Sequence, residues 1–182
     1  MLPNAQDGSV LIVVGDVAGK GLQAGMLATL IVGAIRTAAA FTNDPETILA
    51  LLNERLQGRR LVTCLALRID RDGNAVLVNA GHLPPYLNGK ELPIEGALPL
   101  GAVPGSEFSV LKFKLAEEDL LMLMSDGVAE AQSEKGHLFG FERVAEMLSG
   151  RATAAGLATA AQDLGQEDDI TVLAVARLAA AT

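Results

Sequence analysis

The sequence has little of the residue types that support several common chemistries. Its 182 residues include one cysteine, two histidines and no tryptophan. A single cysteine cannot form an internal disulfide, and one cysteine with two histidines does not supply a zinc-type ligand cluster. Cys64 lies in the apolar run LVTCLAL, which is typical of a buried thiol, so we expect a reducing, cytoplasmic setting.

Positive charge and long apolar runs are also scarce. Lys and Arg number 14 against 22 Asp and Glu, a net charge of −8, so the surface would repel nucleic acid. The apolar stretch 21–35, between Lys20 and Arg36, is shorter than the ~20 residues that span hydrocarbon. It predicts a buried helix and no membrane insertion. No signal peptide is visible at the start.

Apolar residues are plentiful, at 50%, and charged residues make up 20%, which is a globular composition. At this length we expect a single domain over residues 1–182. The apolar patterns predict an α+β fold in which helices cover antiparallel sheets. The expected strands are 9–14, 61–69, 75–79, 108–113, 120–124 and 170–176, and the expected helices are 22–39, 45–56, 141–148 and 154–164.

Two local signals support these boundaries. Asp44 followed by Pro45 supplies an N-cap and a proline at the first helical position. The segment 70–74, Asp-Arg-Asp-Gly-Asn, has the chemistry of a hairpin turn, so the strands on either side should pair antiparallel.

The most informative pattern is a set of aspartates at the ends of three apolar strands. Asp16 follows LIVV, Asp126 follows LLMLMS, and Asp168 and Asp169 precede ITVLAVA. If these ends meet, the like charges must take up protons or be held by a cation, and oxygen-only ligands select a hard ion such as Mg²⁺ or Mn²⁺. Alternatively, each aspartate caps a turn or a helix, as aspartate commonly does.

The glycine-rich segment GDVAGKG at 15–21 does not fit the common nucleotide-binding loops. A Walker loop would need glycine in place of Val14 and Ser or Thr in place of Gly21. A dinucleotide fingerprint would follow its strand more closely and would be followed by a second strand, whereas a second helix is expected here.

Seven segments are informative together: GDVAGKG, VTCLALRID, NAGHLPPYL, LPLG, LLMLMSDGVAEAQ, FGFERV and QEDDITVLAVAR. In this order they resemble the bacterial SpoIIE/RsbU-type branch of the PPM (type 2C-like) metal-dependent protein serine/threonine phosphatases, over residues 9–177. The resemblance implies an αββα sandwich, with two packed antiparallel sheets flanked by helices and Mg²⁺ or Mn²⁺ at one end. It also implies hydrolysis of phosphoserine or phosphothreonine on a regulatory phosphoprotein, typically a STAS-domain anti-sigma-factor antagonist.

The resemblance implies roles for individual residues. Asp16 resembles the aspartate that bridges two metal ions, and the Val17 carbonyl stands where the family has a main-chain ligand. Asp126 and Asp168 resemble carboxylate ligands of the first metal, and Asp169 is a further candidate. The catalytic set is then Asp16, Asp126 and Asp168, and the expected reaction is metal-assisted attack of water on phosphorus without a covalent phosphoenzyme.

Two other motif residues have alternative interpretations. His82 has a reference pKa near neutrality and would protonate the leaving alkoxide, or it orders the adjoining proline turn by hydrogen bonding. Lys20 attracts the substrate phosphate, or it is a solvated lysine at a helix start. The apolar helices 22–39 and 48–56 are expected in the core, and they resemble the helices through which partners switch this branch.

The sequence departs from the family pattern at its start. The branch has an upstream strand with a GGD-[FY] motif whose aspartate ligates the second metal, but only 15 residues precede Asp16 and none forms this motif. Asp7 is no substitute, because it lies in a turn at the other end of the next strand, roughly 25 to 30 Å away if that strand is extended. We therefore expect an N-terminally truncated fold, an empty or weak second metal site and low turnover.

The missing strand should leave a sheet edge unpaired, which a second copy of the chain would cover to form a homodimer. Two functions stay open. One is an active protein serine/threonine phosphatase, and the other is a catalytically impaired domain of the same fold that binds a partner in signalling.

Overall fold

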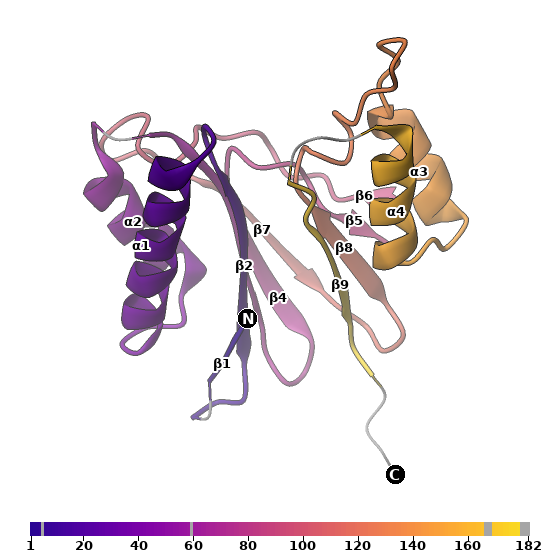
Figure 1. The fold of residues 1–182 in the computed structure, drawn as a ribbon. Helices are drawn as coiled ribbons and strands as arrows, with labels where there is room; N and C mark the ends of the chain where they lie inside the picture. The colour runs from indigo at the N-terminus through magenta and orange to yellow at the C-terminus, as the bar shows by residue number, and fades with distance from the viewer. Residues whose placement is uncertain (5, 59, 166–168, 179–182) are drawn as a thin grey trace. The chain divides into compact units, whose positions relative to one another are not determined.

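The computed structural model describes residues 1–4, 6–58, 60–165 and 169–178. The chain forms two compact units, each with its own sheet and its own pair of helices (Figure 1). The first unit comprises Met1–His82 with Ile94–Leu115, and the second comprises Leu83–Pro93 with Ala116–Thr182. A single domain over residues 1–182 stays a prediction.

The first unit is built on a five-stranded antiparallel sheet. Its strands, in the order β1-β2-β3-β4-β7, are β1 (Leu2–Pro3), β2 (Val10–Val17), β3 (Val62–Ile69), β4 (Asn74–Ala80) and β7 (Ser109–Lys114). The register places Val10 opposite Ile69 and Val17 opposite Val62, so β2 pairs with β3 along its whole length. Cys64 of β3 is buried as predicted, and burial raises the pKa of its thiol to about 12.

Local sequence signals define a turn and a helix start in this unit. Asp70 closes the hairpin between β3 and β4, where its carboxylate accepts a 2.9 Å hydrogen bond from the N–H of Asn74. Asp44 caps α2 (Pro45–Leu56), because its carboxylate accepts a 3.0 Å hydrogen bond from the N–H of Thr47. Both predictions are confirmed.

The helix α1 (Leu22–Ala39) has the predicted bounds but not the predicted burial. Its inner face joins a core with α2 and the sheet through Ala24, Leu27, Ile31 and Ile35. Its outer face is open: Leu22 is 81% exposed and Leu30 is 62% exposed. The expectation of a buried helix is therefore wrong, because α1 and α2 form one layer that covers the sheet from one side only (Figure 1).

Among the described residues, α1 alone is long and apolar enough to cross a membrane by length and composition. It has 18 residues, three more than the apolar stretch between Lys20 and Arg36. A core helix of a folded unit can have the same length and composition, and α1 contributes to such a core.

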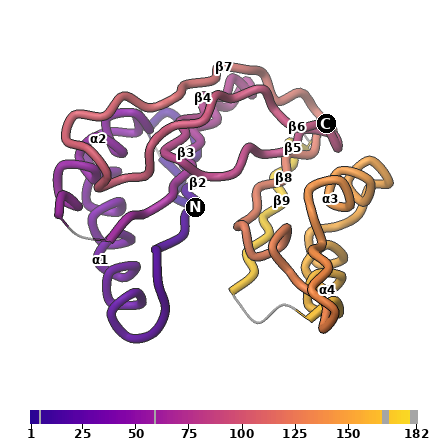
Figure 2. The backbone as a smooth tube through the Cα atoms, turned by 90° about the horizontal axis from the view of Figure 1, so that it is seen from above, coloured from indigo at the N-terminus to yellow at the C-terminus, as the bar shows by residue number. Residues whose placement is uncertain are grey.

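The second unit carries a four-stranded antiparallel sheet and two helices. In the order β6-β5-β8-β9 the strands are β5 (Tyr86–Leu87), β6 (Lys90–Glu91), β8 (Leu120–Met124) and β9 (Val172–Ala176), and the helices are α3 (Gly140–Ser149) and α4 (Ala154–Leu164). Figure 2 shows the two helices beside β8 and β9. Met122, Val144 and Leu157 lie in the core that they share.

The predicted α+β class is confirmed, because the described residues form two antiparallel sheets and four helices. The main difference concerns the first long strand, which the sequence places at 9–14, before Gly15 and Asp16. In the structure β2 continues through both residues to Val17. The reason is the ladder with β3, whose register continues to Val17 and is followed by a 3.0 Å hydrogen bond from the Ala18 N–H to the Leu61 carbonyl.

Candidate metal centre

Asp16 lies in β2, one residue before the strand ends. Its cross-strand neighbour is Thr63 of β3. The Asp16 side chain is exposed and makes no hydrogen bond or ion pair with any residue that the structure describes. A Cβ on Gly15, the preceding residue, would lie 2.6 Å from the carbonyl oxygen of Thr63. The close approach of β3 therefore requires glycine there, and the sheet fixes Asp16 while leaving its carboxylate available to a cation.

Backbone groups along β2 alternate between its two sides. The N–H of Ala18 donates to the Leu61 carbonyl at 3.0 Å, so the even-numbered residues of β2 bond to β3 and the odd-numbered ones face the opposite edge. Ser9 agrees with this alternation, because its carbonyl accepts from the N–H of Asn4 on the β1 side. The Val17 carbonyl therefore faces away from β3, and the ladder leaves it available as the main-chain ligand that the family resemblance implies.

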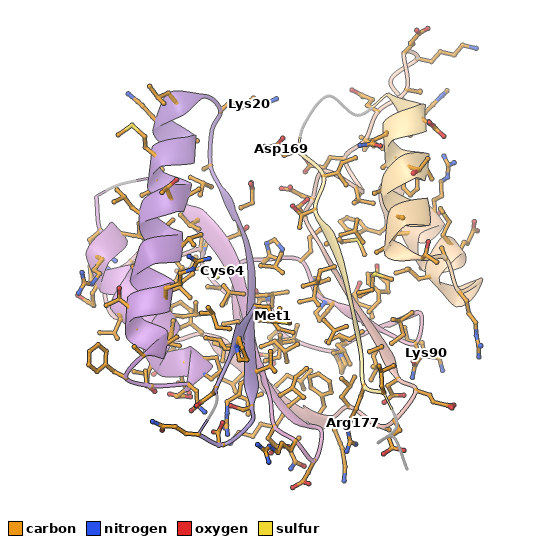
Figure 3. The ribbon with its side chains drawn as sticks, turned by 60° about the horizontal axis from the view of Figure 1, so that its bottom comes forward. Met1, Lys20, Cys64, Lys90, Asp169 and Arg177 are labelled. Atoms are coloured by element: carbon orange, nitrogen blue, oxygen red, sulfur yellow. The ribbon has the colours of Figure 1, made fainter. Side chains whose placement is uncertain are left out.

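Arg60 holds the loop that follows β2. Its Nη1 donates to the Ala18 carbonyl at 3.0 Å, and its Nη2 donates to Oε1 of Gln23 at 3.1 Å. Gly19, with φ of 103°, leaves the space that the guanidinium occupies. Arg60 has no recognisable signal in the sequence, because it lies 42 residues from its carbonyl partner. Lys20 lies in the same loop (Figure 3), and its two alternative roles stay predictions.

His82 is held by two neighbours in the first unit. Its ring Nδ1 lies 2.9 Å from Oγ1 of Thr63, the residue across from Asp16. The Asn79 side chain makes two hydrogen bonds with the His82 backbone: Oδ1 accepts from the His82 N–H at 2.8 Å, and Nδ2 donates to the His82 carbonyl at 3.1 Å. The Asn79 contacts support the loop-ordering role, while the Thr63 contact links the ring to the neighbour of Asp16. Both roles of His82 stay predictions.

The second unit presents Asp126 and Asp169 at the same end of its sheet. Ser125 continues the pairing of β8 with β9: its N–H donates to the Thr171 carbonyl at 2.9 Å, and its Oγ accepts from the Thr171 N–H at 3.0 Å. Asp126 follows in a turn, and Asp169 lies just before β9 (Figure 3). The Asp126 side chain is exposed and has no hydrogen bond or ion pair with another described residue. Asp168 lies outside the described residues.

These groups fit a hard divalent cation in their chemistry. Asp16, Asp126 and the Val17 carbonyl offer oxygen donors only, and no described cationic side chain neutralises the two carboxylates. Within the described ranges, which do not include Asp168, no three His, Cys, Asp or Glu side chains group closely enough to hold a metal ion. Because Asp16 belongs to the first unit and Asp126 and Asp169 to the second, their shared site stays a prediction.

Asp7 lies in a turn before β2, as predicted. Its carboxylate accepts hydrogen bonds from the N–H and hydroxyl of Ser9 and from Nδ2 of Asn43, and it lies 3.5 Å from Nη2 of Arg68. These bonds, led by that from the Ser9 hydroxyl, lower the pKa of Asp7. The length of β2 separates Asp7 from Asp16, so Asp7 serves the turn.

Comparison with known proteins decides the family. The protein-family model described as Stage II sporulation protein E (SpoIIE) matches residues 6–178, which is nearly the whole chain. The chain belongs to the SpoIIE family. This family membership confirms the resemblance to the SpoIIE/RsbU-type branch of the PPM phosphatases, and it places the chain among PP2C-type phosphatase domains.

Individual proteins that are similar to this SpoIIE-family chain are consistent with the family assignment. Protein IcfG of Synechocystis sp. is 27% identical over 217 residues, covering 94% of this chain and 34% of IcfG, so the chain spans about a third of that relative. The SiaA-PP2C domain of Pseudomonas aeruginosa is 26% identical with a TM-score of 0.79, covering 96% of this chain and 78% of that one. RsbX in complex with magnesium is 16% identical with a TM-score of 0.70, covering 94% and 82%. The fold is the α+β sandwich of PP2C-type domains, as predicted.

Proposed function

We propose that this SpoIIE-family chain hydrolyses phosphoserine or phosphothreonine on a regulatory protein, with Mn²⁺ or Mg²⁺ as cofactor. One observation carries the proposal: Asp16 near the end of β2 and Asp126 just after β8 are both exposed and have no partner among the described residues. Carboxylates that are held rigidly and left uncompensated are the groups a cation stabilises. The proposed catalytic set is Asp16, Asp126 and Asp168.

The residues proposed to hold the cation are Asp16, Val17, Asp126, Asp168 and Asp169, through carboxylate oxygens and one main-chain carbonyl. When bound, a divalent cation lowers the pKa of coordinated water and offsets charge on the phosphoryl oxygens. The oxygen-only donor set supports Mg²⁺ or Mn²⁺, and so does the magnesium complex of RsbX, a protein of the same fold.

Residues of the first unit would hold Asp16 and the neighbouring loops in position for this reaction. The β2–β3 ladder fixes the backbone at Asp16, and Arg60 holds the loop that follows. Lys20 would place one positive charge of that loop near the dianionic phosphate. For His82 we propose loop ordering, because Asn79 bonds to both its N–H and its carbonyl, and protonation of the leaving alkoxide is the competing role.

We expect slow turnover from these 182 residues alone. On the side of β2 that faces away from β3, β1 pairs only with Val10 and Leu11. Among the described residues, no strand on that side carries a carboxylate beside Asp16. With one tight cation site and one weak or empty site, a second cation would not be available to offset charge on the attacking and leaving oxygens.

The proposed substrate is a cytoplasmic phosphoprotein, following the resemblance to phosphatases that act on STAS-domain anti-sigma-factor antagonists. The net charge of −8 disfavours nucleic acid as a partner. We propose no membrane insertion, because the inner face of α1 belongs to the core of the first unit.

Hydrolysis of p-nitrophenyl phosphate with and without Mn²⁺ tests the proposal. Asp126→Asn keeps the size of the side chain and removes its charge. It should lower Mn²⁺-dependent turnover at least about 100-fold, since loss of an outer-shell partner already costs about 10 to 100-fold. The thermal midpoint should stay unchanged.

The matched control is Glu130→Gln in the same turn, where Glu130 is exposed and only its N–H bonds to the Asp126 carbonyl. This variant should keep full turnover. Mn²⁺-dependent hydrolysis that survives Asp126→Asn would show that Asp126 is not a ligand.

A second candidate function is partner binding by a catalytically impaired domain of the same fold. An apolar groove of about 300 Å³ between α1 and α2 favours it, with Leu30 and Leu52 in its lining. Arg55 also lines the groove and makes no ion pair with any described residue. A partner helix with an apolar stripe and a carboxylate opposite Arg55 fits this surface. Binding of such a helix, without Mn²⁺-dependent hydrolysis of any phosphorylated substrate, would favour this function over the first.

A further inference from the structure

Residues 99–103, called the LPLG segment because they include most of that motif, lie along the start of β3. The N–H of Leu100 donates to the Val62 carbonyl at 2.9 Å, and the N–H of Val62 donates to the Leu100 carbonyl at 3.2 Å. β4 pairs with β3 farther along, over residues 65–69 of β3. At Val62 the LPLG segment therefore takes the position that a neighbouring strand would have.

The part of β3 that the LPLG segment contacts is also the part that pairs with the proposed ligands. Val62 has the segment on one side and Val17 of β2 on the other, and the next residue, Thr63, lies opposite Asp16. This end of the sheet thus consists of the end of β2, the start of β3 and the LPLG segment. A displacement of the segment would act on Val17 and Asp16 through a single intervening strand.

The LPLG segment also contacts the loop that carries His82. A Cβ on Gly81, the residue before His82, would lie 2.8 Å from the backbone nitrogen of Pro99. The backbones of the loop and the segment are therefore in direct contact. One segment supports both the end of β2 and the loop at His82.

The buried side chain of Asn53 attaches the LPLG segment to α2. Its Oδ1 accepts a hydrogen bond from the Gly101 N–H at 2.8 Å, and its Nδ2 donates to the Val103 carbonyl at 2.9 Å. These two backbone groups need one acceptor and one donor, and a side-chain amide provides both. Asn53 therefore holds the segment at two points, on either side of residue 102.

We propose that Asn53 is a positioning residue for the metal centre: by holding the LPLG segment against β3, it fixes the end of the sheet that presents Asp16 and the Val17 carbonyl. The inference rests on the proposed function, which makes these two groups metal ligands. Groups that orient ligands without touching the metal change metal affinity or activity about 10 to 100-fold. A residue that only ties a helix to a loop would change stability and leave the metal affinity of the folded chain as it was.

Calorimetric titration of Mn²⁺ into two α2 variants separates these roles. Asn53→Ala removes both bonds to the LPLG segment and should raise the Mn²⁺ dissociation constant about tenfold. Ile48→Val is the control, because it removes one methylene from a buried position of the same helix and leaves both bonds in place. It should lower stability and keep the dissociation constant nearly unchanged, with both variants measured well below their thermal midpoints.

The possible outcomes distinguish this inference from the proposed function. Equal Mn²⁺ affinity in Asn53→Ala and Ile48→Val, with Mn²⁺-dependent hydrolysis intact in the parent chain, would overturn the positioning role alone. A parent chain that binds no Mn²⁺ would overturn the proposed function and this inference with it.

Amide hydrogen exchange on the unmodified chain gives a second test, which stays decisive if Asn53→Ala does not fold. Because coupling between two sites is reciprocal, Mn²⁺ binding should slow exchange at the amides of Leu100 and Gly101. The control is the amide of Asn74, which bonds to Asp70 in the hairpin at the other end of β3 and should exchange at the same rate with and without Mn²⁺. Unchanged exchange in the LPLG segment at saturating Mn²⁺, or equal slowing at both ends of β3, would contradict the proposal.

Discussion

The two units hold their exposed aspartates in different ways. Asp16 lies inside a strand that is paired along its length with β3, and the preceding glycine sits against the Thr63 carbonyl. Asp126 lies in a turn, which the two hydrogen bonds between Ser125 and Thr171 tie to the segment before β9. A ladder fixes a side chain through the backbone, whereas the turn depends partly on one hydroxyl. Changes beside Asp16 should therefore act mainly on folding, and changes beside Asp126 mainly on metal affinity.

Gly15→Ala should give the largest effect on folding. The new Cβ would lie 2.6 Å from the Thr63 carbonyl oxygen, so the ladder must shift, and the free energy of unfolding should fall by about 1 to 3 kcal/mol. Gly33→Ala on α1 is the matched control, because its Cβ would meet nothing within 4 Å, and it should raise stability by about 0.5 to 1 kcal/mol. Urea denaturation measures both. An unchanged free energy of unfolding in Gly15→Ala would mean that the ladder does not fix Asp16.

Ser125→Ala should act on the metal centre instead. It removes the hydroxyl that accepts the Thr171 N–H, so stability should fall by about 1 kcal/mol. Mn²⁺ affinity should fall about tenfold, because Asp126 loses a support for its position. Ser133→Ala removes the same kind of bond, to the His137 N–H, away from Asp126. Equal losses of Mn²⁺ affinity in the two variants, by calorimetric titration, would contradict the role given to Ser125.

Thr63→Val separates the two roles of His82 with a smaller effect. The variant keeps the branched shape in β3 and removes the hydroxyl near Nδ1 of His82. The bonds from Asn79 to the His82 backbone remain, so a loop-ordering histidine predicts an unchanged pH profile of kcat. A general-acid histidine predicts a displaced alkaline limb and a several-fold lower kcat.

Lowering the pH should reveal the smallest effect, at Asp7. Hydrogen bonds led by that from the Ser9 hydroxyl lower its pKa in the folded chain below the ordinary value of 3.8. The stabilisation is therefore fully present above that value and is lost as the pH falls through the lower, folded pKa. Urea midpoints of Asp7→Asn should consequently fall less steeply between pH 5 and pH 2 than those of the parent chain. Parallel curves would show that the ionised carboxylate does not support the turn.

The parts of the fold that the sequence predicts are those that local chemistry decides. Asp44 before a proline marks the start of α2, and the segment 70–74 marks a hairpin. β2 was predicted too short, because glycine and aspartate disfavour strands, whereas pairing with β3 carries the strand through both. The exposure of α1 escaped prediction for a related reason. Its sequence is apolar on most sides, so only packing against its neighbours decides which side is covered.

The candidate site shows the same division between residues that local sequence reveals and residues that only the fold brings together. The aspartates are visible in sequence because each ends an apolar run, but the residues that position them are not. Arg60 and Asn79 act through contacts that depend on the fold. Thr63 left a weak signal, as a hydroxyl within an apolar strand, and Ser125 another, as the polar residue directly before Asp126. Their roles follow from strand register, which a pattern of residue types does not specify.

Calorimetric titration of Mn²⁺ tests the central claim most directly, namely that aspartates from the two units bind one cation. The measurement compares the parent chain with Asp16→Asn and Asp126→Asn, each checked for an unchanged thermal midpoint without metal. We predict one tight site in the parent chain and its loss in both variants. A tight site that survives either substitution, or two comparably tight sites in the parent chain, would contradict the account.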